Sequence, residues 1–481
     1  MFRNIFRIFL CSWAVVSSSL PAQNRAIELT IEQSVQRLRE QNQSLKIAGQ
    51  EIASARNAHR QVSSFWYPRI GASGAYIHTS DKIEVKESLK QFTDPAKDFV
   101  QSILPDDQLI AAVLDQIGSH SLTLPLAPRN LTTIDAQIVW PVFTGGKRFY
   151  AGKISRTAVS LAESGREQTA AGLQILLVES YYGLRLNQRV ETVRQETYLS
   201  LQQHYRNALK LEANGMITKA ERLFVQVSMD EARRELETAR NNLSVAQNAL
   251  KALINEESES DIRPVSALFV NDTLPPAAYF KEVTAGRNYT LNRLRMQENI
   301  IGSELKMNRA GYLPEIALFG KQTLYAHGIN RHLVPRSVIG VGFTWNLFDG
   351  LERERKIRQT QISQQTLAIS REKAMTDLSV AVDKFYSQLQ NALDNISALN
   401  TTIELCQELV RMRKRSFAEG MATSTEVVDA EVMLSKARIA SLLAYYQYDV
   451  ALINLLATCG IPEDFYTYSR TGRSELGLFE P

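Results

Sequence analysis

The 481-residue sequence is poor in the residues that interrupt helices. Proline is absent from Val142 to Arg263 and again from Arg336 to Ile461, and glycine is also absent between Gly350 and Gly420. The 69 residues between these two glycines would form a helix about 104 Å long at 1.5 Å per residue. Such a length excludes a fold of short elements and favours long helices packed as a coiled coil or a helical barrel.

The sequence also lacks clear motifs for catalysis, metal binding or phosphate binding. The six histidines are scattered without metal-ligand spacing, and no Gly-x-Ser-x-Gly motif occurs. The Thr-Gly-Gly-Lys segment at 144–147 only faintly resembles a phosphate-binding loop, because Pro141 and Arg148 depart from that pattern. We therefore predict no enzyme, no cofactor and no metal centre.

The first 22 residues are expected to form a signal peptide that is removed. Arg3 and Arg7 precede an apolar run from Ile8 to Val16, which is too short to span a bilayer, and small residues then lead to Ala22. Bulky residues precede Cys11, so we expect no lipid attachment. Without the two arginines the net charge falls from +4 to +2, which excludes the basic surface that nucleic-acid binding requires. No later stretch reaches about 18 apolar residues, so we predict an exported protein without a helical anchor.

Apolar residues recur along the second long helix at alternating spacings of four and three. This spacing is the a and d seam of a coiled coil, sustained for more than four heptads. The seam residues are Leu378, Val382, Phe385, Leu389, Ala392, Ile396, Leu399, Ile403, Cys406 and Val410. Cys406 is therefore expected to be a buried packing residue. Cys459 lies about 37 Å from it along the expected hairpin, so we predict no disulfide.

The chain contains two similar halves, offset by 205 residues. Trp-Pro-Val-Phe-Thr-Gly at 140–145 matches Trp-Asn-Leu-Phe-Asp-Gly at 345–350. Gly-Met-Ile-Thr-Lys-Ala-Glu at 215–221 matches Gly-Met-Ala-Thr-Ser-Thr-Glu at 420–426. We interpret the two halves as tandem repeats.

A third match shows that the first half is longer. Trp-Tyr-Pro at 66–68 resembles Tyr-Leu-Pro at 312–314 with an offset of 246, so the first half has an insertion of 41 residues, which falls within 80–130. The predicted segments are a signal peptide (1–22), the opening helix of the first repeat (23–68), a first β-hairpin with a surface insertion (69–143, insertion 80–130), a first long helical hairpin (144–262), a linker and the opening helix of the second repeat (263–313), a second β-hairpin (314–348), a second long helical hairpin (349–460) and a C-terminal tail (461–481).

Each half has a predicted turn at the end of its long helix. Gly215 and Gly420 stand where a C′ glycine ends a helix. The motifs Thr218-x-x-Glu221 and Thr423-x-x-Glu426 then have the spacing of a capping box, in which hydroxyl and carboxylate each accept from a backbone amide. We predict two helical hairpins with tips near 215 and 420.

Four segments alternate apolar residues with polar or small ones, at 69–79, 133–142, 315–325 and 338–347. Alternation fits a half-buried antiparallel sheet and also a membrane β-barrel. Lengths of about 10 residues suit a tilted outer-membrane span. Aromatic residues gather at the helix-proximal strand ends, as in an interfacial girdle: Trp66, Tyr67, Trp140, Phe143, Tyr312, Trp345 and Phe348. We favour a membrane barrel over a soluble platform, since the helices are committed to their own seams.

Four strands cannot close a membrane barrel, which needs at least eight, and lipid tolerates no open sheet edge. Identical chains must therefore share the barrel, and two, three or four copies would give eight, twelve or sixteen strands. Polar residues and glycines on the inner face favour more than eight. The predicted fold class is mixed: long α-helical hairpins with a membrane β component.

Taken together, the doubled Trp-x-x-Phe-x-Gly and Gly-Met-x-Thr-x-x-Glu motifs resemble those of the TolC-like outer-membrane efflux proteins. The resemblance covers about 28–460. It implies a homotrimer with a twelve-stranded barrel in the outer membrane and a twelve-helix tunnel in the periplasm. It also implies a periplasmic adaptor protein bound to an inner-membrane pump as partners.

The resemblance assigns roles at the tips. Gly215, Met216, Gly420 and Met421 would contact the adaptor, and Glu426 and Asp429 would form an acidic ring at the pore constriction. Ala422 replaces the arginine of the type member, and Phe417 has no hydroxyl. We therefore expect no polar latch at these two positions.

Three functions fit the pattern. The first is a passive exit duct for small toxic compounds, driven by a partner pump. The second is the duct of a type I protein-secretion system, which would use the same architecture. The third is a soluble periplasmic coiled-coil scaffold.

Overall fold

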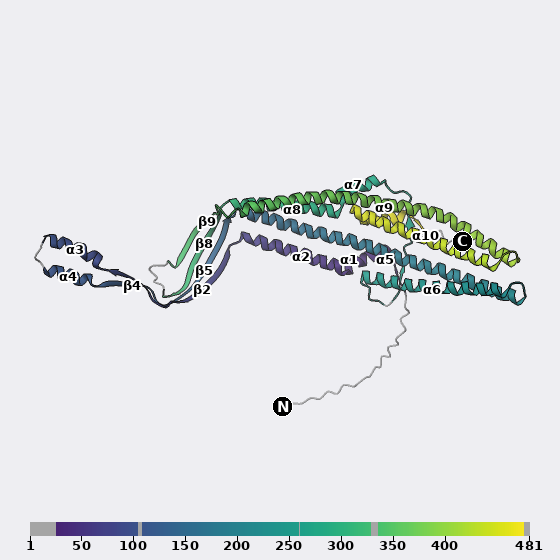
Figure 1. Ribbon diagram of the computed structural model, residues 1–481, viewed down its shortest axis with the longest axis horizontal. Coiled ribbons are helices and arrows are strands. Elements are labelled where there is room, and N and C mark those ends of the chain that lie inside the picture. The colour runs from purple at the N-terminus through teal and green to yellow at the C-terminus, as the bar shows by residue number, and fades with distance from the viewer. Residues whose placement is uncertain (1–25, 104–107, 259, 329–334, 476–481) are drawn as a thin grey trace, which may run out of the picture. The chain divides into compact units, whose positions relative to one another are not determined.

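The computed structural model describes residues 26–103, 108–258, 260–328 and 335–475 (Figure 1). The predicted signal peptide at 1–22 lies outside the described residues, as do the last six residues of the predicted tail. The chain divides into two compact units. One contains 53–160 and 296–367, and the other contains 1–52, 161–295 and 368–481.

The first of these units is built on a four-stranded antiparallel sheet in the order β2-β5-β8-β9. The strands are β2 (Arg69–His78), β5 (Asn130–Phe143), β8 (Glu315–His327) and β9 (Ser337–Thr344). They occupy the four segments that alternation predicts. Within the described residues, β2 and β9 each pair along one edge only. The sheet therefore has two open edges.

One face of the sheet is apolar and exposed. In one cross-strand row Ile70 faces Ile138, Ile138 faces Gly320, and Gly320 faces Ile339. The Ile339 side chain is 89% exposed in the isolated chain. Water does not favour such a surface, so this face is built to be covered by something apolar.

The opposite face is polar or small. Lys321 Nζ lies 2.9 Å from the Asp135 carboxylate, and Thr323 Oγ1 donates to the same carboxylate at 2.7 Å. Phe319, on the same face, lies over Gly340, where a β-carbon would come within 2.7 Å of its ring. The predicted alternation is thus present, with glycines making room for one aromatic ring.

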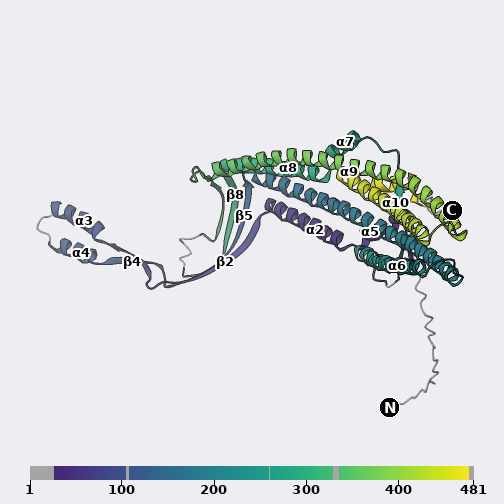
Figure 2. The same cartoon turned by 45° about the vertical axis from the view of Figure 1, so that its right-hand side comes forward.

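The insertion in the first half extends the sheet as a two-stranded ribbon that carries a helical hairpin (Figure 2). The ribbon consists of β3 (Ile83–Ser88) and β4 (Ser121–Ala127), and the hairpin of α3 (Lys90–Ile103) and α4 (Gln108–Gly118). Lys97 Nζ and the Asp115 carboxylate are 2.6 Å apart and join the two helices. The 41 extra residues therefore form an element of their own.

The helices of the two halves have equal lengths. α1 (Ile31–Gln41) and α7 (Ala277–Arg287) have 11 residues, and α2 (Gln43–Ser63) and α8 (Tyr289–Arg309) have 21. α5 (Lys147–Ala213) and α9 (Glu352–Ala418) have 67, and α6 (Lys219–Ile254) and α10 (Ser424–Cys459) have 36. Each of α2 and α8 leads into a three-residue 3₁₀ turn, η1 (Ser64–Trp66) or η2 (Ala310–Tyr312). The long helix without proline or glycine is confirmed.

The predicted seam of α9 faces its neighbours. Seven of its ten residues are buried, and Leu378, Phe385 and Leu399 are half-buried. Cys406 is buried and free, as is Cys459, so the prediction of no disulfide is confirmed. Burial raises the pKa of the Cys459 thiol to about 11, which keeps it protonated and unreactive at neutral pH.

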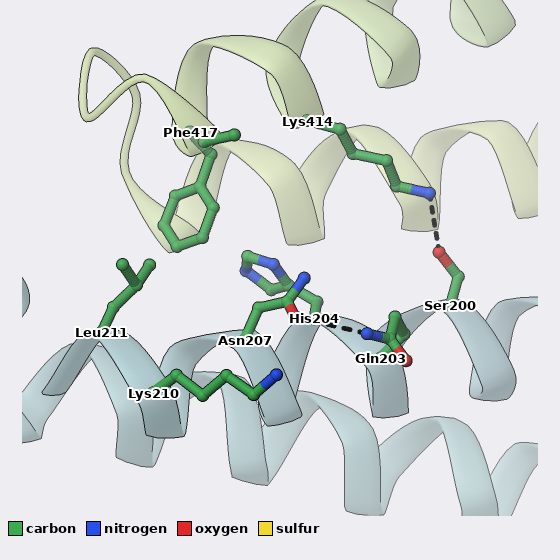
Figure 3. Close-up of a pocket in the computed structure, with 9 residues that line it drawn as sticks. Ser200, Gln203, His204, Asn207, Lys210, Leu211, Lys414 and Phe417 are labelled. Atoms are coloured by element: carbon green, nitrogen blue, oxygen red, sulfur yellow. Dashed lines mark hydrogen bonds between the residues drawn. The ribbon is translucent and has the colours of Figure 1, made fainter. Parts of the chain in front are cut away.

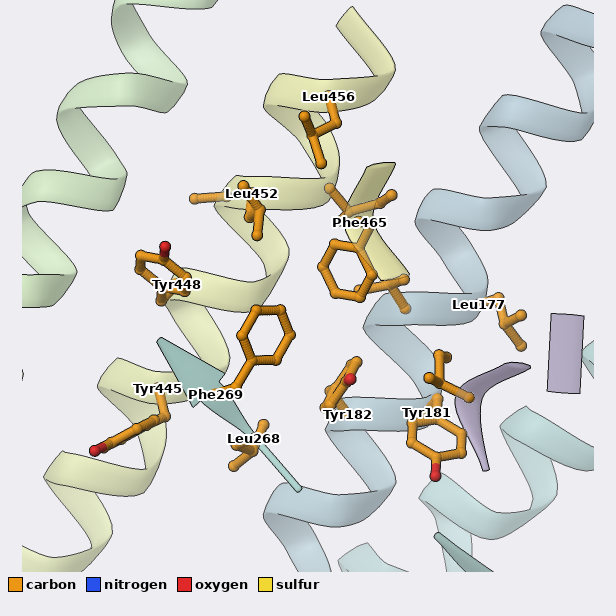
Figure 4. Close-up of a cluster of buried hydrophobic side chains, with 14 of the residues drawn as sticks. Leu177, Tyr181, Tyr182, Leu268, Phe269, Tyr445, Tyr448, Leu452, Leu456 and Phe465 are labelled. Carbon is orange, nitrogen blue, oxygen red and sulfur yellow. The ribbon is translucent and has the colours of Figure 1, made fainter. Parts of the chain in front are cut away.

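The second unit has an aromatic core where short elements meet the long helices (Figure 4). The short elements are β1 (Ile27–Leu29), β6 (Ile262–Pro264), β7 (Phe269–Val270), η3 (Pro462–Asp464), α11 (Phe465–Thr471) and β10 (Arg473–Ser474). β1 pairs with β6, and β10 pairs with β7. Tyr181 and Tyr448 use their hydroxyls to bond the backbone of this layer, at Leu29 O (2.7 Å) and Asn271 O (2.9 Å). These bonds fix the layer to α5 and α10.

α10 is more apolar than the sequence analysis expected. Among the described residues it is the one helix long and apolar enough to cross a membrane by length and composition. The expectation that no later stretch is so apolar is therefore wrong. The reason is that most of this stretch is buried in the core, and a helix with neighbours on all sides is apolar all round.

A carboxyl group is buried in this core with little compensation. Asp449 on α10 is fully buried, and neither of its oxygens has a hydrogen-bond partner among the described residues. Burial raises the pKa of this carboxyl well above its ordinary value. The Phe269 backbone opposes this shift, and the nearby Glu475 adds to it. The Asp449 carboxyl is therefore held protonated in the folded state. Its burial lowers the free energy of unfolding by an amount that grows as pH rises.

Asp449→Asn is expected to stabilise the protein at neutral pH. A raised pKa in the folded state gives stability that is present at acid pH and lost as pH rises through that pKa. Asparagine remains neutral, so the variant should melt a few degrees higher at pH 7.5. The difference should vanish near pH 4, and melting curves at both values measure it. A variant that melts lower at pH 7.5 would contradict the poorly compensated burial of Asp449.

Candidate functional site at the helix tips

The first tip, between α5 and α6, is closed by backbone bonds and a complete cap. Gly215 takes φ +70°, its N–H donates to Glu212 O at 2.9 Å, and Met216 N–H donates to Leu211 O at 2.8 Å. These two bonds form a Schellman motif, which needs the left-handed residue that glycine supplies. Thr218 Oγ1 accepts from Glu221 N, and the Glu221 carboxylate accepts from Thr218 N. Met216 is exposed beside them.

The second tip, between α9 and α10, repeats the turn but not the whole cap. Gly420 (φ +76°) and Met421 donate to the carbonyls of Phe417 at 3.0 Å and Ser416 at 2.8 Å. Thr423 Oγ1 accepts from Glu426 N at 3.4 Å. Met421, like Met216, is exposed.

The return bond of this second capping box is missing in the described structure. The Glu426 carboxylate instead accepts from Arg413 Nη1 of α9 at 2.6 Å. An ionised guanidinium is a stronger donor than a backbone amide. The prediction of a full Thr423–Glu426 box is therefore corrected to half a box.

The two acidic residues assigned to the pore constriction have different surroundings. Glu426 is half-buried and paired with Arg413. Asp429, one turn further along α10, is exposed, and no ion pair joins it to the part of the chain that the structure describes. Of the two, Asp429 therefore carries the less compensated charge.

A pocket of about 580 Å³ lies between α5 and α9, next to the tips (Figure 3). Its lining residues are Ser200, Gln203, His204, Asn207, Lys210, Leu211, Lys414, Phe417 and Ala418. His204 packs edge to face on Phe417, with 4.6 Å between ring centroids. Burial lowers the pKa of His204, and the nearby Lys414 lowers it further. The imidazole is therefore neutral at pH 7, and Phe417 is a packing residue.

An ion pair beside this pocket, buried at its Glu431 end, joins the first helical hairpin to the second. Lys414 of α9 pairs with the Glu431 carboxylate of α10, and its Nζ donates to Ser200 Oγ of α5 at 2.9 Å (Figure 3). Ser200 in turn donates to Glu431, which is only 7% exposed. We call these three residues the tip latch.

Two further polar contacts join the same hairpins at positions farther from the tips than the tip latch. Arg438 of α10 and Glu196 of α5 are 2.9 Å apart, and Arg194 Nη1 of α5 donates to Ser435 Oγ of α10 at 3.4 Å. These contacts lie outside Phe417 and Ala422, the two positions at which the sequence predicted no polar latch. The polar contacts lie about two to six turns into the helices, at positions that the tip motifs do not include.

The predicted aromatic residues lie at the junctions between strands and helices. All seven are exposed. Trp140 Nε1 donates to Trp66 O, and Trp345 Nε1 donates to Tyr312 O, each at 3.0 Å. The two halves therefore fix their strand ends by the same bond.

An arginine completes each junction. Arg148 donates to Phe65 O (3.1 Å) and Val142 O (2.6 Å), and it stacks over the Trp66 ring. Arg353 donates to the carbonyls at 311 and 347, both at 3.2 Å, and stacks over Tyr312. Leu351 at φ +66° occupies the place that Gly146 takes in the first half. The second junction thus keeps the positive φ angle of the first, although leucine disfavours that backbone conformation.

Comparisons with known proteins agree with this geometry. A family model described as "Outer membrane efflux protein" matches residues 284–460. The alkaline protease secretion protein AprF of Pseudomonas aeruginosa is 24% identical over 299 residues, covering 61% of this chain and 62% of that protein. The outer membrane protein TolC of Escherichia coli is 21% identical over 237 residues, covering 46% of this chain and 48% of that protein. The aligned regions therefore span 62% of AprF and 48% of TolC, less than two thirds of either relative.

The fold is matched over more of the chain. The crystal structure of the outer-membrane protein VceC of Vibrio cholerae superposes with a TM-score of 0.68 at 14% identity, covering 89% of this chain and 96% of that one. The chain is thus similar to the outer membrane efflux proteins, with the family match itself confined to residues 284–460. In this TolC-like chain the family match runs from α7 to the end of α10, so it includes the second tip and Arg353 but not the first tip.

Sequence reasoning missed the tip latch and the junction arginines of this TolC-like chain. Glu431 could have been noticed, because it follows the apolar Val427, Val428 and Ala430 on the buried side of α10. Arg148 and Arg353 could also have been found, since they share the 205-residue offset of the motifs they follow. No comparable signal marks Ser200 or His204.

Proposed function

We propose that this protein is the outer-membrane exit duct of a tripartite efflux system. It conducts small molecules passively from a pump–adaptor complex to the exterior, and it does no catalysis itself. The observation that carries the proposal is the four-stranded sheet with one exposed apolar face and two open edges. A soluble scaffold would have no use for such a sheet, whereas lipid would cover the apolar face.

Closure of the sheet requires other copies of the chain. Lipid tolerates no open edge, and three copies would supply twelve strands. In this assembly the edge of β2 pairs with β9 of the next copy, and the polar face with Asp135 and Lys321 lines the lumen. The matched helix lengths support two tandem repeats per chain, hence a twelve-helix barrel in the periplasm.

The helix tips are the proposed contact with partners. Met216 and Met421 are exposed on two turns of the same geometry. Methionine adapts its shape to apolar partners. We assign to these tips a periplasmic adaptor protein bound to an inner-membrane pump.

Protein secretion is the second candidate. The similarity to AprF, a protease secretion protein, extends over 299 residues and favours it. The two candidates differ in the substrate that the partner delivers to the duct: small toxic compounds in the first and a secreted protein in the second. Deletion of the chain should sensitise cells to small toxic compounds in the first case, and should retain a secreted protein inside the cell in the second.

Native mass and conductance of the mature protein test the proposal. In mild detergent the mass should be that of three chains, and in planar bilayers the same sample should form cation-preferring channels. A single subunit that stays monodisperse in buffer without detergent would overturn the duct and leave the soluble scaffold.

Removal of both acidic residues at the constriction should widen the channel and weaken its cation preference. Three copies each of Glu426 and Asp429 around a narrow axis attract cations and repel anions. We expect Glu426→Ala with Asp429→Ala to raise single-channel conductance a few-fold in planar bilayers. Asp429→Ala alone should give most of the change in selectivity, since Glu426 is paired with Arg413. Unchanged conductance and selectivity would remove the assignment of the acidic ring.

A further inference from the structure

The pocket between α5 and α9 has the size and the lining of a small-molecule site. Its volume of about 580 Å³ falls within the range of about 300–1,000 Å³ that is usual for ligand pockets. Leu211 of α5 and Phe417 and Ala418 of α9 form its apolar wall, and most of its polar lining residues come from α5 (Figure 3). An apolar wall with a few polar groups both buries a ligand and fixes its orientation.

One buried polar atom of the lining has no partner. His204 is only 5% exposed, and its Nε2 has no hydrogen-bond partner within the described part of the chain. Buried polar atoms are normally bonded, because leaving one unpaired costs free energy. His204 lines the pocket, so a ligand bound there can supply the missing bond.

The charge of the lining favours an acid. Lys210 and Lys414 line the pocket, and none of its nine lining residues is acidic. Lys414 is paired with Glu431, but Lys210 is exposed and has no ion pair with any residue that the structure describes. Asn207 accepts from Gln203 through its side-chain oxygen at 3.3 Å, which leaves its amide N–H groups to donate. An ionised carboxylate is the acceptor that suits an ammonium and an amide together.

The aromatic side of the pocket favours a ring. His204 and Phe417 pack edge to face, and both belong to the lining. A further aromatic ring packs favourably against such a pair in an offset or edge-to-face arrangement. Leu211 adds an aliphatic surface. The lining as a whole therefore fits a small aromatic ring that carries one acidic group.

We propose that this pocket binds a small aromatic acid, which holds the two helical hairpins together. The acidic group accepts from Lys210 and Asn207 of α5, and the ring packs on Phe417 of α9. His204 Nε2 donates to the same acid and so gains the bond that it lacks. Binding does not depend on the proposed duct, whereas the effect of binding on conduction rests on that proposed function.

An acid in this pocket favours joined hairpins. The lining comes from both α5 and α9, so the pocket is lost when these two helices part. A ligand that binds one of two states shifts the population toward that state. Ser200 and Lys414 of the tip latch also line the pocket and are bonded to each other. The bound acid therefore acts together with the tip latch and keeps the periplasmic end of the duct closed.

Protection of an introduced cysteine measures binding. Ala418 is exposed in the lining, whereas the natural Cys406 and Cys459 are buried, so Ala418→Cys provides the reactive thiol. In the purified protein, about 1 mM 2-naphthoate should slow the labelling of this thiol by a maleimide about five-fold. Lys210→Gln added to this variant should remove most of the protection, because it removes the unpaired cation.

Two controls separate a specific site from general adsorption. Val227 of α6 is exposed but does not line the pocket, so Val227→Cys should be labelled at the same rate with and without 2-naphthoate. The uncharged 2-naphthalenemethanol should protect Ala418→Cys much less than 2-naphthoate does. Equal protection by the two compounds would overturn the assigned acid.

Two other outcomes would overturn the site itself. One is an unchanged labelling rate of Ala418→Cys in 2-naphthoate. The other is labelling that is slow in the trimer without any ligand and fast in the dissociated chain, since a second copy of the chain would then fill the pocket.

Conductance tests the effect on the hairpins. In planar bilayers, 2-naphthoate added on the side of the helix tips should lower mean single-channel conductance about two-fold or more, and Lys210→Gln should abolish this response. Unchanged conductance together with full protection of Ala418→Cys would show that the acid binds without holding the hairpins. A protein that forms no channels but still shows protection would refute the proposed duct alone, so the two failures are distinguishable.

Discussion

Glu431→Ala is expected to open the periplasmic end of the duct and to raise mean single-channel conductance several-fold. Glu431 is buried and holds Lys414 of α9 and Ser200 of α5 together. Its loss removes charge-assisted bonds worth about 1.5–3 kcal/mol. Each 1.4 kcal/mol changes an equilibrium tenfold, so the ratio of closed to open tips should fall about 10- to 100-fold. Recordings in planar bilayers measure the change.

Matched variants separate this effect from a general change of charge. Glu419→Ala removes an equal charge from an exposed position near the second tip and should leave conductance as it was. Glu431→Gln keeps the shape and should have an intermediate effect. Lys414→Ala added to Glu431→Ala should change little more, because coupled residues are not additive. Full additivity of the two substitutions would show that the tip latch does not act as a unit.

Ile138→Arg or Ile339→Arg should abolish assembly in the outer membrane. Both residues lie in the same apolar cross-strand row. An arginine facing lipid near mid-membrane costs about 2–4 kcal/mol, and the cost recurs in each copy of the chain. The expected result is a loss of the trimer band and of protein in the outer-membrane fraction. Phe343→Arg, near the end of β9, should have a smaller effect.

Gln137 provides the control for these variants. It neighbours Ile138 on β5 but points to the opposite, polar face, where its cross-strand partner is Lys321. Gln137→Arg should therefore assemble at near-normal yield. If Ile138→Arg assembled equally well, the apolar face would not be the one in contact with lipid.

The sequence predicted elements well where one physical rule dominates. The long helix α9 follows from the absence of proline and glycine and from a seam of which Val382 and Ile396 are fully buried members. The turns at Gly215 and Gly420 follow from the need for a left-handed residue. The strands follow from alternation, since a slip of one residue would move every apolar side chain to the other face.

The remainder depends on contacts between elements distant in sequence. Glu426 has the spacing of a cap, but the guanidinium of Arg413 outcompetes the backbone amide. Spacing along one helix does not reveal a cation on another. The tip latch likewise joins residues from three helices, more than 200 positions apart at its ends. The helical hairpin of the insertion was not predicted from the sequence, and Pro95, which lies inside α3, disfavours a helix there.

The equal lengths of α5 and α9 limit how the helical part of such a duct can become longer or shorter. One residue inserted in α9 would rotate everything beyond it by 100° and turn the seam away from its neighbours. Seven residues would restore the rotation but push the second tip about 10 Å past the first. Tunnels that span a wider or narrower periplasm must therefore differ by whole heptads, gained or lost together in α5, α6, α9 and α10.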